Sequence, residues 1–87
     1  MSSLRLRYLA SLREELGIAE ETLEVPTSGI DFEQVLTLIS RRHGPAAVAA
    51  LTADSVRLAC NQELVERSGL RLVAGDELAF LPPVTGG

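Results

Sequence analysis

The sequence predicts one domain of the α+β class, with a mixed sheet of about five strands covered on one face by one main helix. The chain has 87 residues, which is the length of a single domain. Its 46% hydrophobic and 23% charged residues provide enough apolar surface to form a core. Apolar residues repeat first with the period of a strand, then with helical spacing, then again as strands, and this order favours a single sheet with one covering helix.

The first third of the chain predicts two strands joined by a short helix. Residues 4–9 alternate between apolar and basic side chains until Leu9, which falls on the basic face. Residues 10–16 carry leucines four apart and stop at Gly17, as is typical of a short helix closed by glycine. Residues 21–25 alternate again, and we expect this second strand to turn back on the first.

The main helix is predicted to begin after Asp31 and to end at His43. Asp31 is a good N-cap, Gln34 follows three residues later as in a capping box, and apolar side chains then recur at helical spacing. Basic residues in the last turn suit the negative end of a helix, and Gly44 followed by proline is a stop signal. A turn of alanine-rich helix at residues 45–51 is a further expectation.

The last third of the chain predicts three more strands. Residues 55–60 alternate, and the Asn-Gln pair that follows is a turn into a short strand at residues 63–65. A Gly-Asp turn at residues 75–76 leads into the last strand at residues 78–81.

The charge balance excludes several classes of partner. Eight arginines, no lysine and twelve acidic residues give a net charge of -4, which repels a phosphate backbone, so no nucleic acid partner is expected. No uncharged run approaches the roughly 18 residues of a membrane span, so no membrane partner is expected. A single cysteine and an N-terminus unlike a signal peptide favour a cytoplasmic location.

The titratable residues argue against catalysis by this chain alone. There is one histidine, one cysteine and no phosphate loop or metal-ligand spacing, so no metal and no permanently bound cofactor is expected. A structural or solvated role is favoured for His43, and a buried, unreactive thiol for Cys60. The consecutive acidic pairs at residues 14–15 and 20–21 diverge, and we interpret them as solvated.

The C-terminal stretch is the unusual feature of the sequence. Residues 82–87 read Pro-Pro-Val-Thr-Gly-Gly and carry no charged side chain before the terminal carboxylate. The prolines favour an extended exit from the last strand, and the glycines remove bulk, so that the carboxylate is able to enter a narrow channel. A frayed terminus is the alternative, and the residues alone leave this choice open.

Apolar side chains at three positions lie out of phase with the predicted core. Leu9 and Leu81 fall opposite the apolar sets of their own strands, and one side chain of the adjacent pair Leu64 and Val65 must point away from the core. An exposed apolar patch beside a tail is typical of a docking surface, although isolated surface leucines are common.

These stretches resemble a known family. Residues 61–65 (Asn-Gln-Glu-Leu-Val), residues 74–87 and the Leu-Arg-Glu at residues 12–14 are similar to the small subunit of molybdopterin synthase, a MoaD-type sulfur carrier. The resemblance covers most of the chain and is weakest at residues 46–54. The connection at residues 28–30 departs from the family by being longer. It implies a ubiquitin-like β-grasp domain at residues 1–81 and a reactive tail at residues 82–87.

The resemblance also implies a function in molybdenum cofactor biosynthesis. The Gly87 carboxyl would be adenylated by an E1-like (MoeB-type) enzyme that consumes ATP, and a sulfur donor such as a cysteine desulfurase or rhodanese would convert it to a thiocarboxylate. The tail would then enter the large subunit of molybdopterin synthase (MoaE-type) and give its sulfur to cyclic pyranopterin monophosphate.

The same resemblance implies roles for individual residues. They comprise the reactive end, the inserted arm and an apolar docking patch. The reactive end is formed by Gly87 and Gly86. The inserted arm is formed by Pro82, Pro83, Val84 and Thr85. The apolar docking patch is formed by Leu9, Leu64 and Leu81.

Three alternatives are open at this point. A related carrier supplies sulfur for thiazole formation in thiamine synthesis, although that family is shorter and lacks the Pro-Pro-Val-Thr lead. A ubiquitin-like protein modifier would form isopeptides through Gly87. A plain binding module would use the sheet face and would not need its terminus.

Overall fold

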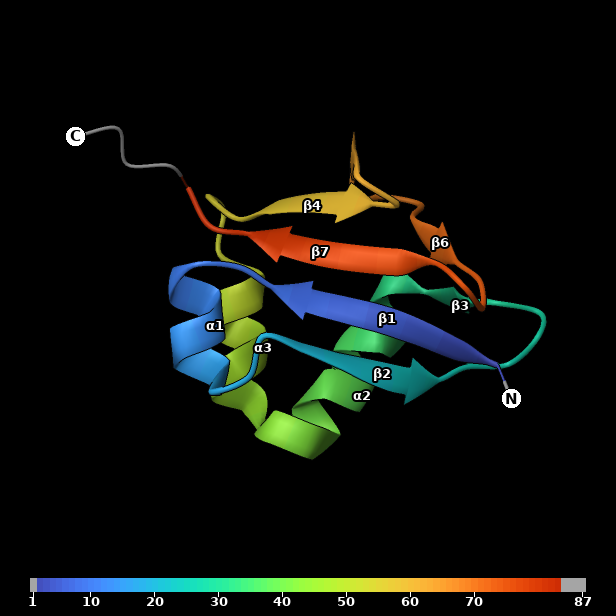
Figure 1. Cartoon of the computed structure of the whole chain (residues 1–87), viewed down its shortest axis with the longest axis horizontal. Coiled ribbons are helices and arrows are strands. Elements are labelled where there is room, and N and C mark those ends of the chain that lie inside the picture. The colour runs from blue at the N-terminus through green and yellow to red at the C-terminus, as the bar shows by residue number, and fades with distance from the viewer. Residues whose placement is uncertain (1, 84–87) are drawn as a thin grey trace.

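A five-stranded mixed sheet forms the centre of the structure, a computed structural model in which residues 2–83 are described (Figure 1). The strand order is β2-β1-β7-β4-β5. The strands are β1 (Ser3–Tyr8), β2 (Glu20–Glu24), β4 (Arg57–Cys60), β5 (Glu63–Val65) and β7 (Glu77–Leu81). Among the strand pairs of this sheet within residues 2–83, only β1–β7 is parallel. The last strand therefore lies in the middle of the sheet, held on both sides.

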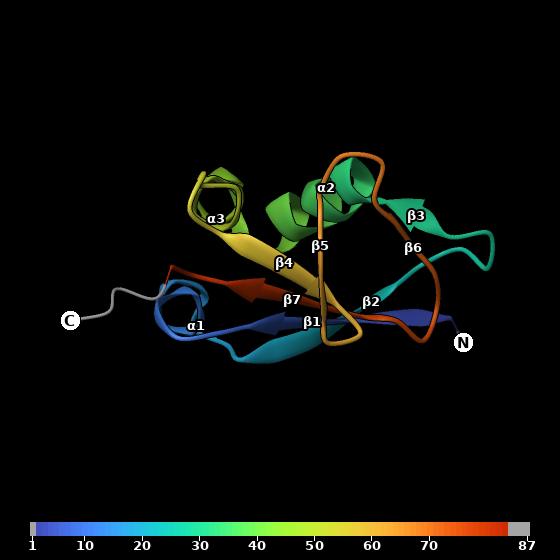
Figure 2. The ribbon, with the colours of Figure 1, turned by 90° about the horizontal axis from the view of Figure 1, so that it is seen from above.

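Three helices within residues 2–83 accompany the sheet: α1 (Ser11–Leu16), α2 (Phe32–His43) and α3 (Pro45–Leu51). Figure 2 shows α2 and α3 on the same side of the sheet and α1 level with the strands, at the end of β1. The predicted capping box is confirmed, because the Asp31 carboxylate accepts a hydrogen bond from the Gln34 N–H at 2.8 Å and the Gln34 side chain accepts one from the Asp31 N–H at 3.0 Å. The main helix is confirmed as α2, and both shorter helices are also present.

The core lies between the sheet and helices α2 and α3. It is aliphatic apart from three aromatic rings, and the Tyr8 and Phe80 rings stack with their centroids 5.7 Å apart. Burying each large side chain contributes roughly 1.5–3 kcal/mol. The fully or almost fully buried members on the five-stranded sheet are Leu4, Leu6, Tyr8, Leu23, Leu78 and Phe80, and those on α2 are Phe32, Val35 and Ile39.

A second, small sheet was not predicted from the sequence. Strands β3 (Ile30–Asp31) and β6 (Arg71–Leu72) pair antiparallel, and two residues are too few to show an alternating pattern. The turn before β3 contains Gly29 with φ +97°, where an added Cβ would lie 2.9 Å from the Leu72 carbonyl oxygen. The longer connection at residues 28–30 therefore serves this pairing, far from the end of β7.

None of the helices within residues 2–83 has the length and apolar character needed to cross a membrane.

Candidate docking face and tail root

The uncovered face of the sheet carries the predicted docking leucines. Leu64 pairs with Ala59, and Ala59 pairs with Ala79. Directly paired residues share a face, and residues two apart on one strand do so as well, which adds Leu81 to this row. The three strands β5, β4 and β7 thus present one apolar row.

Leu9 joins this row from the neighbouring strand. Its N–H donates to the Phe80 carbonyl oxygen at 3.2 Å, so the ladder continues one residue past the Tyr8–Phe80 pair and places Leu9 beside Leu81. We refer to Leu9, Leu64 and Leu81, with the small and buried Ala59 and Ala79 between them, as the sheet-face patch.

The patch leucines are outside the buried core. Leu64 is 71% exposed, and Leu9 and Leu81 are half-buried. The expected shared patch is therefore confirmed as a placement on one face, whereas its docking role stays a prediction.

The tail begins at the edge of this patch. Pro82 is half-buried and Pro83 exposed, and neither proline has an N–H with which to continue the ladder beyond Leu81. The predicted residues Val84, Thr85, Gly86 and Gly87 lie outside the described residues. Because β7 is held by β1 and β4, the point at which the tail leaves the domain is fixed.

The opposite end of the same face is charged. The Arg5 and Arg7 guanidinium groups lie 3.9 and 4.0 Å from the Glu77 carboxylate at the start of β7. Exposed pairs of this length contribute little to stability. The face is therefore divided into a charged half near Glu77 and an apolar half near the tail.

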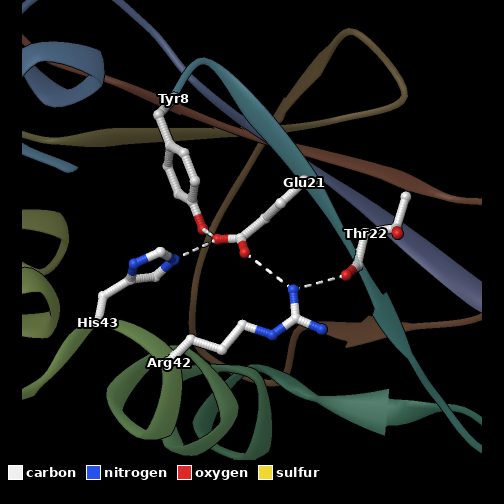
Figure 3. A network of polar contacts seen from close by, with 5 residues as sticks. All are labelled: Tyr8, Glu21, Thr22, Arg42 and His43. Carbon is white, nitrogen blue, oxygen red and sulfur yellow. Dashed lines mark hydrogen bonds and ion pairs between the residues drawn. The ribbon is translucent and has the colours of Figure 1, made fainter. Parts of the chain in front are cut away.

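A polar cluster on the helix side ties β1, β2 and α2 together (Figure 3). The Glu21 carboxylate accepts hydrogen bonds from the Tyr8 hydroxyl at 2.5 Å and from Arg42 Nη1 at 2.9 Å, and it lies 2.8 Å from His43 Nε2. Arg42 also donates to the Thr22 carbonyl oxygen at 2.8 Å. The cluster thus fastens the end of α2 to the edge strand β2.

The interpretation of residues 20–21 as a solvated pair is wrong for Glu21. Its side chain is only 10% exposed, because pairing with Leu6 turns it toward the helices. The sequence held a signal for this placement, since Glu21 lies two residues before Leu23 in the same alternation. A structural role for His43 is confirmed by its contact with Glu21.

The cluster keeps Glu21 ionised and Tyr8 neutral. Burial raises the pKa of the Glu21 carboxyl, but hydrogen bonds with Tyr8, Arg42 and His43 outweigh it, so the pKa lies below the ordinary value. Burial, followed by the hydrogen bond to Glu21, raises the pKa of the Tyr8 hydroxyl far above its ordinary value. The cluster is therefore suited to holding structure rather than to moving protons near neutral pH.

Replacing Glu21 by glutamine is expected to make the protein less stable at neutral pH by about 1–3 kcal/mol, because a charged acceptor of several hydrogen bonds is lost. A carboxyl whose folded-state pKa is lowered stabilises the fold above its unfolded-state pKa of about 4.3, and this stabilisation is lost as pH falls through the folded-state value. The gap between wild type and Glu21→Gln should therefore close on acidification, as measured by urea unfolding followed by circular dichroism. The exposed neighbour variant Glu20→Gln is the control, and a gap that does not change with pH would contradict this account.

The remaining titratable residues show no reactive arrangement. Burial first, and then the carboxylates of Asp76 and Glu63, raise the pKa of the Cys60 thiol, so it stays protonated and weakly nucleophilic. Within residues 2–83 no three His, Cys, Asp or Glu side chains are grouped so as to hold a metal ion. The sheet-face patch and the tail that follows Leu81 are therefore kept as the candidate site.

Solved structures with the same architecture define the class of the protein. SAMP1, the small archaeal modifier protein 1 of Haloferax volcanii, superimposes with a TM-score of 0.79 at 27% identity, covering 98% of this chain and 99% of that one. A chain of the complex of subunits 1 and 2 of molybdopterin-converting factor from Helicobacter pylori matches with a TM-score of 0.65, over 98% of this chain and 99% of that chain. Its 18% identity shows the fold alone. The fold is the ubiquitin-like β-grasp that the resemblance implied.

The chain belongs to the ThiS family, whose model matches residues 6–87. Among its relatives, the molybdopterin synthase sulfur carrier subunit of Chlamydomonas reinhardtii is 36% identical over 97% of this chain and 98% of its own. The human molybdopterin synthase sulfur carrier subunit is 33% identical over 100% of this chain and 97% of its own. The resemblance described from the sequence is thus confirmed over nearly the whole length.

Proposed function

We propose that this protein is the sulfur carrier subunit of a molybdopterin synthase. The observation that carries the proposal is the position of Leu81, which ends the central strand, belongs to the sheet-face patch and directly precedes the Pro-Pro-Val-Thr-Gly-Gly tail. A partner that covers the patch receives the tail at a defined point. The relatives that match over the full length support the same function.

The Gly87 carboxylate has to be activated before it can carry sulfur, because a carboxylate at neutral pH is a poor electrophile. An E1-like enzyme joins one carboxylate oxygen to the α-phosphorus of ATP and releases pyrophosphate. Sulfur from a persulfide-bearing donor then attacks the acyl carbon, and AMP leaves with that oxygen. Reduction of the resulting acyl disulfide by a thiol frees a thiocarboxylate, in which one oxygen of Gly87 has been replaced by sulfur.

The chain contributes positioning to this chemistry and no acid or base. Pro82 and Pro83 favour an extended exit, and Gly86 and Gly87 present no side chain to a narrow channel. The activating enzyme supplies the ATP site, so this chain needs no permanently bound cofactor. Gly87 is both a substrate and a reagent.

The second partner is the large subunit of the synthase. In Helicobacter pylori a chain of this fold is part of the complex of subunits 1 and 2 of molybdopterin-converting factor, which supports such an assembly here. The dithiolene of molybdopterin contains two sulfur atoms, whereas one tail carries one sulfur. Each product therefore consumes two charged carriers, which requires the carrier to dissociate and be replaced.

The stoichiometry of the reaction tests this function. Thiocarboxylated chain is mixed with the large subunit and cyclic pyranopterin monophosphate, and dithiolene product and remaining thiocarboxylate are both quantified. We expect two carriers to lose sulfur for each product formed. Absence of product, with a large subunit that is active with another carrier, would refute the proposal.

Protein modification is the second candidate, and the similarity to SAMP1 favours it. A modifier and a sulfur carrier share the adenylation of Gly87 and differ in the group that attacks the acyl adenylate. Lysine amines of a target would yield isopeptides, which are stable to thiols and visible by mass spectrometry of tryptic fragments. The thiazole carrier would instead discharge its sulfur with thiazole synthase and not with the pyranopterin.

A further inference from the structure

We propose that Arg57 is a docking residue that binds a carboxylate of the large subunit beside the point where the tail leaves the domain. This inference rests on the proposed function and adds to it a polar anchor of defined charge. Arg57 lies on β4, at the rim of the sheet-face patch.

Arg57 lies next to the last residue of the central strand. It pairs with Leu81 in the β4–β7 ladder, so the two side chains share the uncovered face. It is exposed, and it lines an open groove of about 890 Å³ that extends from Leu64, Leu81 and the two prolines to the connection between α3 and β4 at residues 52–56. A partner that covers the patch and receives the tail must therefore also cover Arg57.

Most arginines of the chain are already held by contacts within residues 2–83. Their partners are carboxylates, a carbonyl oxygen or an aromatic ring, as in the Arg67 guanidinium that lies 5.3 Å above the Phe32 ring and 3.5 Å from Glu33. The held arginines are Arg5, Arg7, Arg42, Arg67 and Arg71.

The other three arginines make no ion pair or side-chain hydrogen bond with any described residue. Arg13 lies on α1 and Arg41 on α2, so among residues 2–83 Arg57 is the one arginine of the uncovered face without such a contact. The Arg57 guanidinium thus makes no ion pair or side-chain hydrogen bond with residues 2–83 at the place where a partner would dock.

The chemistry of burial specifies what the partner must supply. Covering an apolar patch removes water from its rim, and a guanidinium that loses water without gaining an acceptor destabilises the complex. A carboxylate accepts two parallel hydrogen bonds from the planar guanidinium group and also neutralises its positive charge. Since the chain as a whole carries a net charge of -4, a cation at this position also fixes the orientation of the complex.

The carboxylate at the end of this chain is a poorer candidate for the same role. Gly87 is six residues beyond Leu81, and the two prolines that follow Leu81 favour an extended exit. Binding its own terminus would also withdraw the reacting group from both partners. The test below distinguishes these two carboxylates.

The experiment compares charge reversals at two exposed arginines. The dissociation constant for the isolated large subunit is measured by isothermal titration calorimetry at low and moderate salt for wild type, Arg57→Glu, Arg57→Gln and Arg41→Glu. We expect Arg57→Glu to weaken binding by about a hundredfold and Arg57→Gln by about tenfold. Arg41→Glu, on the helix layer, should change binding by less than about twofold. Thermal unfolding of each variant confirms that the fold is retained.

The same comparison is repeated in chains whose C-terminal carboxyl group has been converted to an amide, which removes this charge and keeps every residue. The loss caused by Arg57→Glu should persist there, because the acceptor belongs to the partner. Disappearance of the loss would show that Arg57 binds the terminus of its own chain and would overturn the inference, as would equal losses at Arg57 and Arg41. Failure of the wild-type chain to bind the large subunit would instead overturn the proposed function, and the inference with it.

Discussion

Removal of Gly86 and Gly87 is expected to abolish sulfur transfer to the pyranopterin while leaving binding to the large subunit within about tenfold of wild type. The deletion removes the acyl carbon that is activated, so no thiocarboxylate forms at the correct position. The sheet-face patch lies entirely within residues 9–81 and is unchanged. Product formation and the dissociation constant are measured on the same preparation of the truncated chain.

The truncated chain should also act as a competitive inhibitor. It occupies the large subunit through the patch, and excess charged wild-type chain should restore product formation. A plain binding module would keep all of its activity after this deletion. Retained sulfur transfer by the truncated chain would contradict the role of the diglycine.

Placing a charge on the sheet-face patch is the second change with a large expected effect. Leu64→Glu should weaken binding to the large subunit by about a hundredfold, because the new carboxylate would be buried in an apolar contact without a partner. Leu64 is 71% exposed, so the substitution leaves the core intact. The dissociation constant is measured by calorimetry on chains whose unfolding temperature matches that of wild type.

Val73→Glu is the matched control for this substitution. Within residues 2–83 Val73 is the other large hydrophobic residue that is well exposed, at 47%, and it lies between β6 and β7, outside the five-stranded sheet. It should bind like wild type. Equal weakening by the two substitutions would mean that negative charge in general, and not the sheet-face patch, governs docking.

The parts of the fold that were predicted from the sequence are those with a local periodic signal. The capping box at Asp31 and the alternation in β1 and β7 are properties of neighbouring residues, so they could be identified from the sequence alone. The pairing of β3 with β6 joins residues about forty apart in two-residue strands, and a pattern so short carries no period. It depends on tertiary contacts that the sequence alone does not display.

The residues of the candidate site also divide into those that a local pattern predicts and those that depend on how the strands pair. The phases of Leu9 and Leu81 followed from strand alternation, and the structure places both leucines beside each other. Glu21 was misassigned because two consecutive acidic residues were treated alike, although alternation turns only one of them toward the helices. The position of Arg57 beside Leu81 depends on the register between β4 and β7. The alternation within a single strand does not show this register, so it could not identify Arg57 as part of the site.

The most direct test of the central claim is the intact mass of the chain after incubation with ATP, an E1-like activating enzyme and a sulfur donor. The account predicts a mass gain equal to the exchange of one oxygen for one sulfur, and no gain in a chain lacking Gly87. An unchanged mass for the full chain, with an activating enzyme that charges another carrier in the same mixture, would contradict it.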